Sequence, residues 1–215
     1  MKVVIVDYGM GNIRSVAKAI EHVAPEASVV VTSDAAVVRA ADRVVVPGQG
    51  AMHDCMREFL ARDLRQCVEE AAASKPFLGV CVGMQMLFEH SEEGDTPGLA
   101  ILPGRVRRFP NGMTDDAGNR LKVPHMGWNE AEIPTGHPVW QGLEANERFY
   151  FVHSYYCDPR FDTPATAGAI KVQARYGLPF TCAVVQDNIV AVQFHPEKSA
   201  RAGLQLLANF MNWQP

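Results

Sequence analysis

The stretch Phe77-Leu-Gly79-Val-Cys81-Val-Gly83-Met-Gln85 carries the clearest structural signal in the chain. An apolar, strand-like run leads into Gly-x-Cys-x-Gly, and apolar residues at helical spacing follow it (Met84, Leu87, Phe88). This pattern is typical of a nucleophile elbow, a sharp strand-to-helix turn, here with cysteine in the place of serine. Small residues on either side let neighbouring backbones approach closely. The N-terminus of the following helix favours a thiolate at Cys81. The competing interpretation is a buried cysteine that serves as a small hydrophobic residue.

A nucleophilic thiol needs a base, and the base needs a group that orients it. His195 is the best placed of the seven histidines, because it follows the apolar run Ile189–Phe194. In extended backbone, residues i and i+2 share a face, so we expect the Glu197 carboxylate to reach the ring nitrogen that His195 does not use on sulfur. The alternative is that His195 is a satisfied polar group at the end of a strand.

The first half of the chain alternates short apolar runs with helical periodicity. We expect strands at Lys2–Val6, Ser28–Val31, Arg43–Val46 and Phe77–Val80, and helices at Ile13–Val23 and Cys55–Ala73. This βαβ order predicts an α/β fold with a doubly wound, mainly parallel sheet and right-handed crossovers. Ligands collect at the carboxyl edge of such sheets, where Cys81 and His195 would lie.

The second half changes to short alternating segments separated by Gly, Pro and Asn. Antiparallel strands are expected at Arg105–Phe109, Trp128–Ile133, Arg148–Tyr155, Ala169–Tyr176, Thr181–Val185 and Ile189–Phe194. A last helix is expected over Ser199–Trp213, with Ser199 as its N-cap. Patterned strands lie close on both sides of the loop-like segments 94–104 and 111–120, so we expect one domain without linkers.

Bulk composition excludes several classes of protein. The 215 residues are 47% hydrophobic, which suits one large domain with a sizeable core. The formal net charge of −4 disfavours a nucleic-acid partner. We expect neither a signal peptide nor a membrane span, because no apolar run is long enough. The five cysteines lack CxxC spacing, so we expect neither disulfides nor a metal site, and a reducing cytoplasm is the simplest location.

Acyl transfer at Cys81 would require hydrogen-bond donors aimed at a developing oxyanion. The N–H of Val82, directly after the nucleophile, is one donor that an elbow supplies. The segment Val46-Pro-Gly-Gln-Gly50 leaves an apolar strand with two glycines that are free to orient a peptide, so Gly50 is the expected second donor. An ordinary strand-to-helix turn is the alternative for this segment.

These elements resemble class I, triad-type glutamine amidotransferases in three places: the segment around Cys81, the Pro-Gly-x-Gly loop and the late His195-Pro-Glu197. The resemblance spans essentially the whole chain. Four further segments are similar to the glutaminase subunits of imidazole glycerol phosphate synthase, from histidine biosynthesis: Asp7-Tyr-Gly-Met-Gly-Asn12, Pro124-His-Met-Gly-Trp-Asn129, Tyr150-Phe-Val-His-Ser-Tyr155 and Gln193-Phe-His-Pro-Glu-Lys-Ser199. One departure is Gln49, where many relatives carry a small apolar residue.

The resemblance implies a flavodoxin-like fold, a single domain over residues 1–215 and a defined reaction. Cys81 would form a glutamyl thioester with L-glutamine, while His195 protonates the leaving ammonia and activates water, and Glu197 orients His195. Gln85, Glu93 and the backbone of Ser154 and Tyr155 would bind the substrate. His153 would pack in its strand and would not act as a second base.

The resemblance also implies a partner and no cofactor. The partner is a separate (β/α)8-barrel cyclase subunit that uses the ammonia to form imidazole glycerol phosphate and AICAR. The residues expected near the interface of this heterodimer are Gly11, Asn12, Met126, Trp128 and Lys198. Two alternatives stay open. One is a glutaminase of another assembly, such as those of the anthranilate or vitamin B6 pathways, and the other is an inactive regulatory module.

Overall fold

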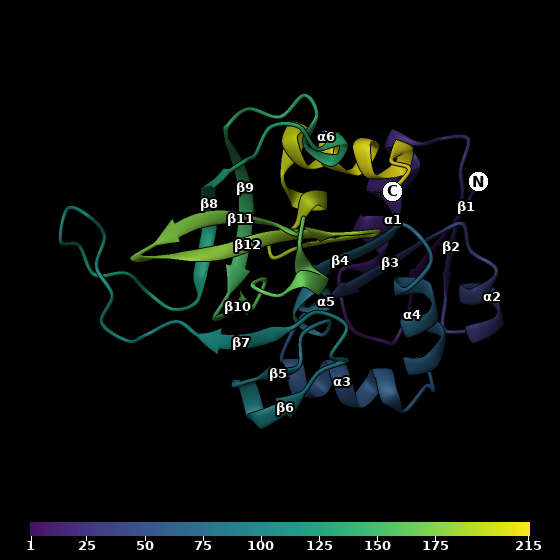
Figure 1. The fold of residues 1–215 in the computed structure, drawn as a ribbon, viewed down its shortest axis with the longest axis horizontal. Coiled ribbons are helices and arrows are strands. Elements are labelled where there is room, and N and C mark those ends of the chain that lie inside the picture. Colours follow the sequence, from purple (N-terminus) through teal and green to yellow (C-terminus); the bar gives the residue numbers. More distant parts are fainter.

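The computed structural model describes residues 1–215 and contains one mixed, 13-stranded sheet (Figure 1). Its parallel part has the strand order β2, β1, β3, β4 and β13, which span Ser28–Thr32, Lys2–Val6, Arg43–Gly48, Phe77–Cys81 and Ile189–Val192. The predicted α/β class with a mainly parallel, doubly wound sheet is confirmed. The predicted strands of the first half lie within one or two residues of those observed.

Helices cover both faces of the parallel strands. Helices α1 (Ile13–Val23) and α6 (Ala200–Asn212) pack against each other on one face, and α2 (Ala35–Arg39) packs against α4 (Arg65–Ala72) on the other. Between β3 and α4 lies α3 (Met52–Leu60), and α5 (Val82–Gln85) follows β4. This arrangement follows from the crossovers, since β1 to β2 and β2 to β3 run in opposite directions across the sheet.

The single helix predicted over Cys55–Ala73 is wrong, because α3 and α4 are separate helices. The break lies at Ala61–Leu64, where Asp63 adopts a positive φ of 51°. Leu64 is fully buried, so the apolar spacing continues through the turn and hides the break in the sequence. The helix after the elbow is also shorter than its apolar pattern indicates, since α5 has one turn.

The second half adds antiparallel strands to the parallel core, as predicted. They are β7 (Gly104–Arg108), β8 (His125–Glu132), β9 (Asn146–His153), β10 (Tyr155–Pro159), β11 (Ile170–Tyr176) and β12 (Leu178–Gln186). Short strands β5 (His90–Ser91) and β6 (Thr96–Pro97) form the edge. The strand predicted over Arg148–Tyr155 is wrong at its end: Ser154 separates β9 from β10, which pair with different neighbours.

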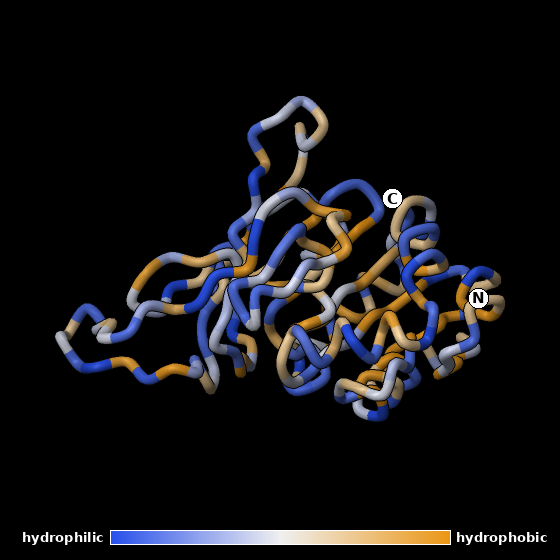
Figure 2. The backbone as a smooth tube through the Cα atoms, turned by 90° about the horizontal axis from the view of Figure 1, so that it is seen from below, coloured by the Kyte–Doolittle hydropathy of each residue, from blue (hydrophilic) through white to orange (hydrophobic).

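The hydrophobic core runs through the whole sheet. It includes strands buried along almost their entire length, such as β3, β4 and β13. Figure 2 shows the hydrophobic segments gathered around the half that holds both chain ends, while the projecting loops are largely hydrophilic. Strands buried on both faces are typical of parallel sheets between helices, and this rigid centre carries the site described next.

Candidate active site

Cys81 lies at a tight turn between β4 and α5. Its φ of 56° is a strained conformation for a residue with a side chain, as expected at a nucleophile elbow. Gly83 permits the turn, because a Cβ atom there would lie 1.9 Å from the carbonyl oxygen of Val46. The last residue of β3, Gly48, which pairs with Cys81 in the sheet, is also constrained: a Cβ atom there would lie 2.7 Å from the Gly83 nitrogen. The glycines therefore allow β3 and the elbow to touch.

Three neighbouring parallel strands bring the candidate residues to one edge of the sheet. Strand β4 ends at Cys81, β3 leads into Pro47–Gly50, and β13 leads into His195. A cavity of about 280 Å³ opens here, lined by Gln49, Gly50, Cys81, Val82, Gln85, Glu93, Pro124, Val152, His153, Ser154 and Tyr155. A hollow of about 440 Å³ near His137 is larger but contains no cysteine or carboxylate, so volume alone does not identify the site.

His195 and Glu197 form a buried pair. The Nδ1 atom of His195 lies 2.9 Å from Oε1 of Glu197, and both side chains are almost completely shielded from solvent. The expected reason for this contact is wrong in detail. Residues Pro196–Lys198 form a 3-10 turn, so a turn and not an extended backbone brings the two side chains together.

The other ring nitrogen of His195, Nε2, is buried and makes no hydrogen bond. It nevertheless lies close enough to Cys81 for the two groups to influence each other's charge. Burial lowers the pKa of His195, but interactions with Cys81 and Glu197 outweigh it and raise this pKa to about 10. A base without a formed hydrogen bond to its nucleophile is common before substrate binds.

Gln193 contacts the nucleophile directly, which the sequence reasoning missed. Its Nε2 donates to Sγ of Cys81 at 3.7 Å, and its Oε1 accepts a hydrogen bond from Gln85 at 3.0 Å. Gln193 directly follows β13 and is fully buried. The available signal was a polar residue within an otherwise apolar run, since a buried amide needs a partner.

Gln85, a predicted substrate-binding residue, is held by other protein groups. Its Nε2 donates to the carbonyl of Tyr155 at 3.2 Å as well as to Gln193. The same carbonyl lies 2.8 Å from Nδ1 of His153. Burial lowers the pKa of His153 to about 3, so this imidazole is neutral. The predicted substrate-binding residues Ser154 and Tyr155 therefore border the cavity beside a neutral histidine.

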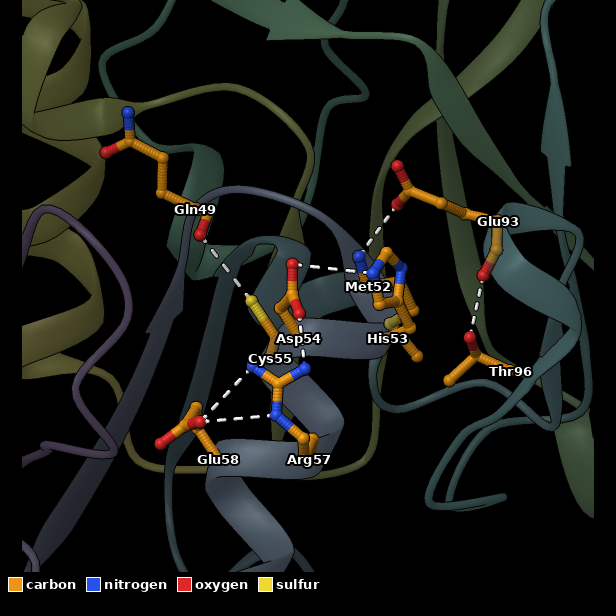
Figure 3. A network of polar contacts seen from close by, with 9 residues as sticks. All are labelled: Gln49, Met52, His53, Asp54, Cys55, Arg57, Glu58, Glu93 and Thr96. Atoms are coloured by element: carbon orange, nitrogen blue, oxygen red, sulfur yellow. Dashed lines mark hydrogen bonds and ion pairs between the residues drawn. The ribbon is translucent and has the colours of Figure 1, made fainter.

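The two predicted oxyanion donors, Val82 and Gly50, both line the cavity. The N–H of Gly50 donates to no protein group, and Gly50 has a φ of 102°. The side chain of Gln49, where a small apolar residue was expected in many relatives, is exposed and points away from Cys55 (Figure 3).

Glu93, predicted to bind substrate, also supports the start of α3. Its Oε2 accepts a hydrogen bond from the backbone N–H of Met52 at 2.8 Å (Figure 3). A carboxylate at this position satisfies one of the free N–H groups of the first helical turn. Glu93 is partly exposed and faces the same cavity as Cys81.

The five residues predicted near a partner interface lie on three segments: the loop after β1, strand β8 and the 3-10 turn Pro196–Lys198. Met126 and Trp128 on β8 are 62% and 46% exposed, high values for large apolar side chains. Lys198 lies over the ring of Tyr150, which also contacts Trp128. Gly11 and Asn12 follow β1, and the Nδ2 atom of Asn12 donates to Oε1 of Glu197 at 3.1 Å. An exposed apolar patch is typical of a binding surface.

Ser199 is the N-cap residue of α6, as predicted, but its side chain forms no capping hydrogen bond with that helix. Its hydroxyl donates to the carbonyl of His195 at 2.6 Å and accepts a hydrogen bond from the N–H of Tyr150 at 2.9 Å. Ser199 thus fixes the backbone of His195 against β9. All five cysteines are free, and no group of three or more histidine, cysteine or acidic side chains is arranged to hold a metal ion. None of the helices has the length and apolar character needed to cross a membrane.

Sequence comparison relates the chain to proteins of known class. The class I glutamine amidotransferase family model matches residues 4–213. Imidazole glycerol phosphate synthase subunit HisH of Aromatoleum aromaticum is 64% identical over 214 residues, covering 99% of both chains. The protein of the same name from Thiobacillus denitrificans is 62% identical, covering 99% of this chain and 92% of its own.

Solved structures share the fold at low sequence identity. A crystal structure described as a glutamine amidotransferase superposes with a TM-score of 0.70 at 19% identity, covering 97% of each chain. The PurLQS structure from Thermotoga maritima gives a TM-score of 0.70 at 16% identity, with 98% of this chain and 97% of that chain covered. At these identities the likeness bears on the fold alone.

Proposed function

Because this chain belongs to the class I glutamine amidotransferase family, among the HisH subunits of imidazole glycerol phosphate synthase, we propose that it hydrolyses L-glutamine to glutamate and ammonia through Cys81, His195 and Glu197. The observation that carries this proposal is the buried pair of His195 and Glu197 beside the strained cysteine elbow. The pair supplies a base and an orienting carboxylate, the two groups that a thiol nucleophile requires.

The proposed reaction has two halves. Sγ of Cys81 attacks the side-chain amide carbon of glutamine, and His195 holds the thiol proton and transfers it to the departing nitrogen, so that ammonia leaves and a glutamyl thioester remains. His195 then removes a proton from water, the hydroxide attacks the thioester carbon, and the sulfur leaves with that proton. Glu197 stabilises the imidazolium in both halves, which agrees with the raised pKa of His195.

The oxyanion of each tetrahedral intermediate would accept hydrogen bonds from the N–H groups of Val82 and Gly50. Both residues line the cavity, and the Gly50 N–H has no other acceptor. Such donors contribute by stabilising charge that develops only in the transition state. Gln85, Glu93, Ser154 and Tyr155 would bind the amino-acid end of glutamine, with the Glu93 carboxylate opposite the substrate ammonium.

The ammonia would pass to a second subunit, a (β/α)8-barrel cyclase that forms imidazole glycerol phosphate and AICAR. The exposed Met126 and Trp128, together with Gly11, Asn12 and Lys198, would contact this partner. We place the protein in the cytoplasm as a single domain over residues 1–215 that needs no cofactor. Direct transfer has a chemical reason, since free ammonia in neutral water is mostly ammonium and is not a nucleophile.

The test is glutamine hydrolysis by the chain with and without the cyclase, using Cys81→Ala as the matched variant. We expect Cys81→Ala to abolish release of ammonia from glutamine while the complex still uses added ammonium salts. Cys55→Ser is not a suitable control because Cys55 contacts the carbonyl of Gln49, which lines the cavity, whereas Cys182→Ser removes a thiol buried in β12. Glutamine hydrolysis by Cys81→Ala at the wild-type rate would refute the mechanism.

A further inference from the structure

The segment Pro47–Gly50, here called the oxyanion loop, accepts hydrogen bonds from two side chains. The hydroxyl of Tyr8 donates to the carbonyl of Pro47 at 2.7 Å. The thiol of Cys55, on the first turn of α3, donates to the carbonyl of Gln49 at 3.5 Å (Figure 3). The loop is therefore tied at both ends of its central dipeptide.

The second contact determines the direction of one peptide group. In a trans peptide the C=O and the following N–H point in opposite directions. Since the Gln49 carbonyl points to Cys55, the Gly50 N–H points away from α3, and it meets no protein acceptor. Glycine at position 50 accommodates the φ of 102° that this orientation requires.

We propose that Cys55 is a positioning residue: its S–H···O=C contact with Gln49 keeps the Gly50 N–H directed at the oxyanion formed at Cys81. This inference rests on the proposed glutaminase function. Cys55 does not touch the reacting atoms and acts through the peptide that it holds. If that contact were absent, the Gln49–Gly50 peptide could rotate and turn its carbonyl toward the developing negative charge, where it would repel it.

Cys55 is well suited to this role. It is fully buried, and burial raises the pKa of its thiol to about 11, so it carries a proton to donate at neutral pH. The helix that carries it is itself fixed, because Glu93 accepts a hydrogen bond from the N–H of Met52 at the start of α3. The position of the Cys55 thiol relative to the oxyanion loop is therefore fixed by α3.

The chain contains a matched control for this contact. Cys67 on α4 is also fully buried, and its thiol donates to the carbonyl of Leu64 at 3.1 Å. Cys55→Ala and Cys67→Ala thus remove the same kind of group from the same kind of environment. Only the first of these contacts involves the oxyanion loop.

The experiment measures four quantities for the wild type, Cys55→Ala, Cys55→Ser and Cys67→Ala in the full chain with its cyclase partner. They are kcat and KM for glutamine, the affinity for a γ-aldehyde analogue of glutamine, and the rate of alkylation of Cys81 by iodoacetamide. The aldehyde forms a hemithioacetal whose oxyanion needs the hole, whereas alkylation forms no oxyanion. The aldehyde therefore reports on the loop, and iodoacetamide reports on the thiol.

We expect Cys55→Ala to lower kcat and aldehyde affinity together by roughly 3- to 10-fold, the effect of one lost hydrogen bond. KM and the alkylation rate should stay unchanged. Cys55→Ser should restore most of the loss because it keeps a donor, and Cys67→Ala should match the wild type. If Cys55→Ala does not fold, Cys55→Val, which fills the space without a donor, takes its place.

The inference would be overturned if kcat and aldehyde affinity of the donor-free variant stayed within a factor of two of the wild type, or if Cys67→Ala showed an equal loss. A parallel loss of Cys81 alkylation would also overturn it, since that indicates a general collapse of the site. Failure of the proposed function looks different, because the wild type itself would then release no ammonia from glutamine.

Discussion

Asn12 donates its side-chain amide to Oε1 of Glu197, the same oxygen that binds Nδ1 of His195. Asn12 is the N-cap residue of α1, yet its side chain forms no capping hydrogen bond with that helix. Asparagine at an N-cap usually stabilises its helix through a side-chain hydrogen bond, but here the side chain contacts the candidate triad instead. This contact links the loop after β1, which is predicted to face a partner, with the carboxylate that orients the base.

Replacing Asn12 with serine separates these two uses. Serine is as good an N-cap as asparagine, so the free energy of unfolding should change by less than about 0.5 kcal/mol. It is too short to reach Glu197, and loss of a hydrogen bond to a charged group should lower kcat for glutamine about tenfold. Steady-state kinetics and urea unfolding of Asn12→Ser measure both quantities.

Asn209→Ser is the matched control for that experiment. The Asn209 amide donates to the carbonyls of Val139 and Gln141 from the C-terminal half of α6, whereas His195 and Glu197 precede the N-terminus of that helix. We expect its kcat to equal that of the wild type. An undiminished kcat in Asn12→Ser would show that Glu197 holds His195 without help.

Patterns within one segment predicted much of this structure. Apolar runs located the parallel strands, and helical spacing located the helices between them. Gly-x-Cys-x-Gly located the elbow, because the turn leaves no room for a side chain at Gly83. The spacing of His195 and Glu197 predicted their contact, although a 3-10 turn and not an extended strand produces it.

Contacts between distant segments escaped prediction. Gln193 and Cys81 are 112 residues apart, and Asn12 and Glu197 are 185 apart, so no local pattern connects either pair. The turn at Ala61–Leu64 was missed for a different reason: buried Leu64 continues the helical spacing through it. The position of Ser199 before α6 predicted a capping residue. Its hydroxyl instead forms hydrogen bonds with the backbones of His195 and Tyr150, which the sequence does not reveal.

Gln193 should increase the reactivity of Cys81. Its Nε2 donor, 3.7 Å from Sγ, stabilises the thiolate that reacts with electrophiles. In Gln193→Leu we expect alkylation of Cys81 by iodoacetamide at pH 7 to slow about threefold or more. In Gln193→Glu it should slow further, because a carboxylate beside the sulfur repels the thiolate.

Gln186→Leu is the control for this series, since Gln186 lies at the opposite end of the β12–β13 hairpin. Its alkylation rate should equal that of the wild type. Equal rates for Gln193→Leu and wild type would mean that the amide holds Gln85 in place without affecting the sulfur.

Glu93 combines a cap on α3 with a proposed role in substrate binding, and two substitutions separate them. Glu93→Gln keeps an oxygen that can accept from the Met52 N–H but removes the charge that would face the substrate ammonium. We therefore expect a KM for glutamine about tenfold higher with little change in the free energy of unfolding. Glu93→Ala should raise KM and also lower the free energy of unfolding by about 1 kcal/mol.

The neighbouring Glu92 provides the comparison, because its carboxylate also accepts a backbone N–H, that of Arg108, but does not line the cavity. Glu92→Gln should leave KM unchanged. A wild-type KM in Glu93→Gln would assign Glu93 to the helix cap alone.

The buried pair of His125 and His153 should make the protein less stable as the pH falls below neutral. Nδ1 of His125 lies 2.9 Å from Nε2 of His153, and the His125 ring stacks on Phe151 and Tyr176. Burial lowers the pKa of His125 to about 4 and that of His153 to about 3. In the unfolded chain, histidine titrates near 6.5.

The sign of the effect follows from proton uptake. Well above pH 6.5 neither state binds these protons, so the pair does not change stability there. Between about pH 6.5 and 4 the unfolded chain binds protons that the folded pair does not bind. The free energy of unfolding therefore decreases as the pH is lowered through this range. The difference between the wild type and His125→Phe isolates the pair from His195, whose raised pKa acts in the opposite direction above pH 6.5. In urea unfolding at pH 7.5, 6.5 and 5, the pair should cause a small loss in the first interval and a larger loss in the second.

His125→Phe removes one titrating ring while keeping an aromatic side chain between Phe151 and Tyr176. It should lower the free energy of unfolding at pH 7.5, because His153 loses a hydrogen-bond partner, but it should reduce the loss between pH 6.5 and 5. His22→Gln, an exposed substitution on α1, should keep the wild-type slope. A slope in His125→Phe equal to that of the wild type would assign the acid sensitivity to other groups.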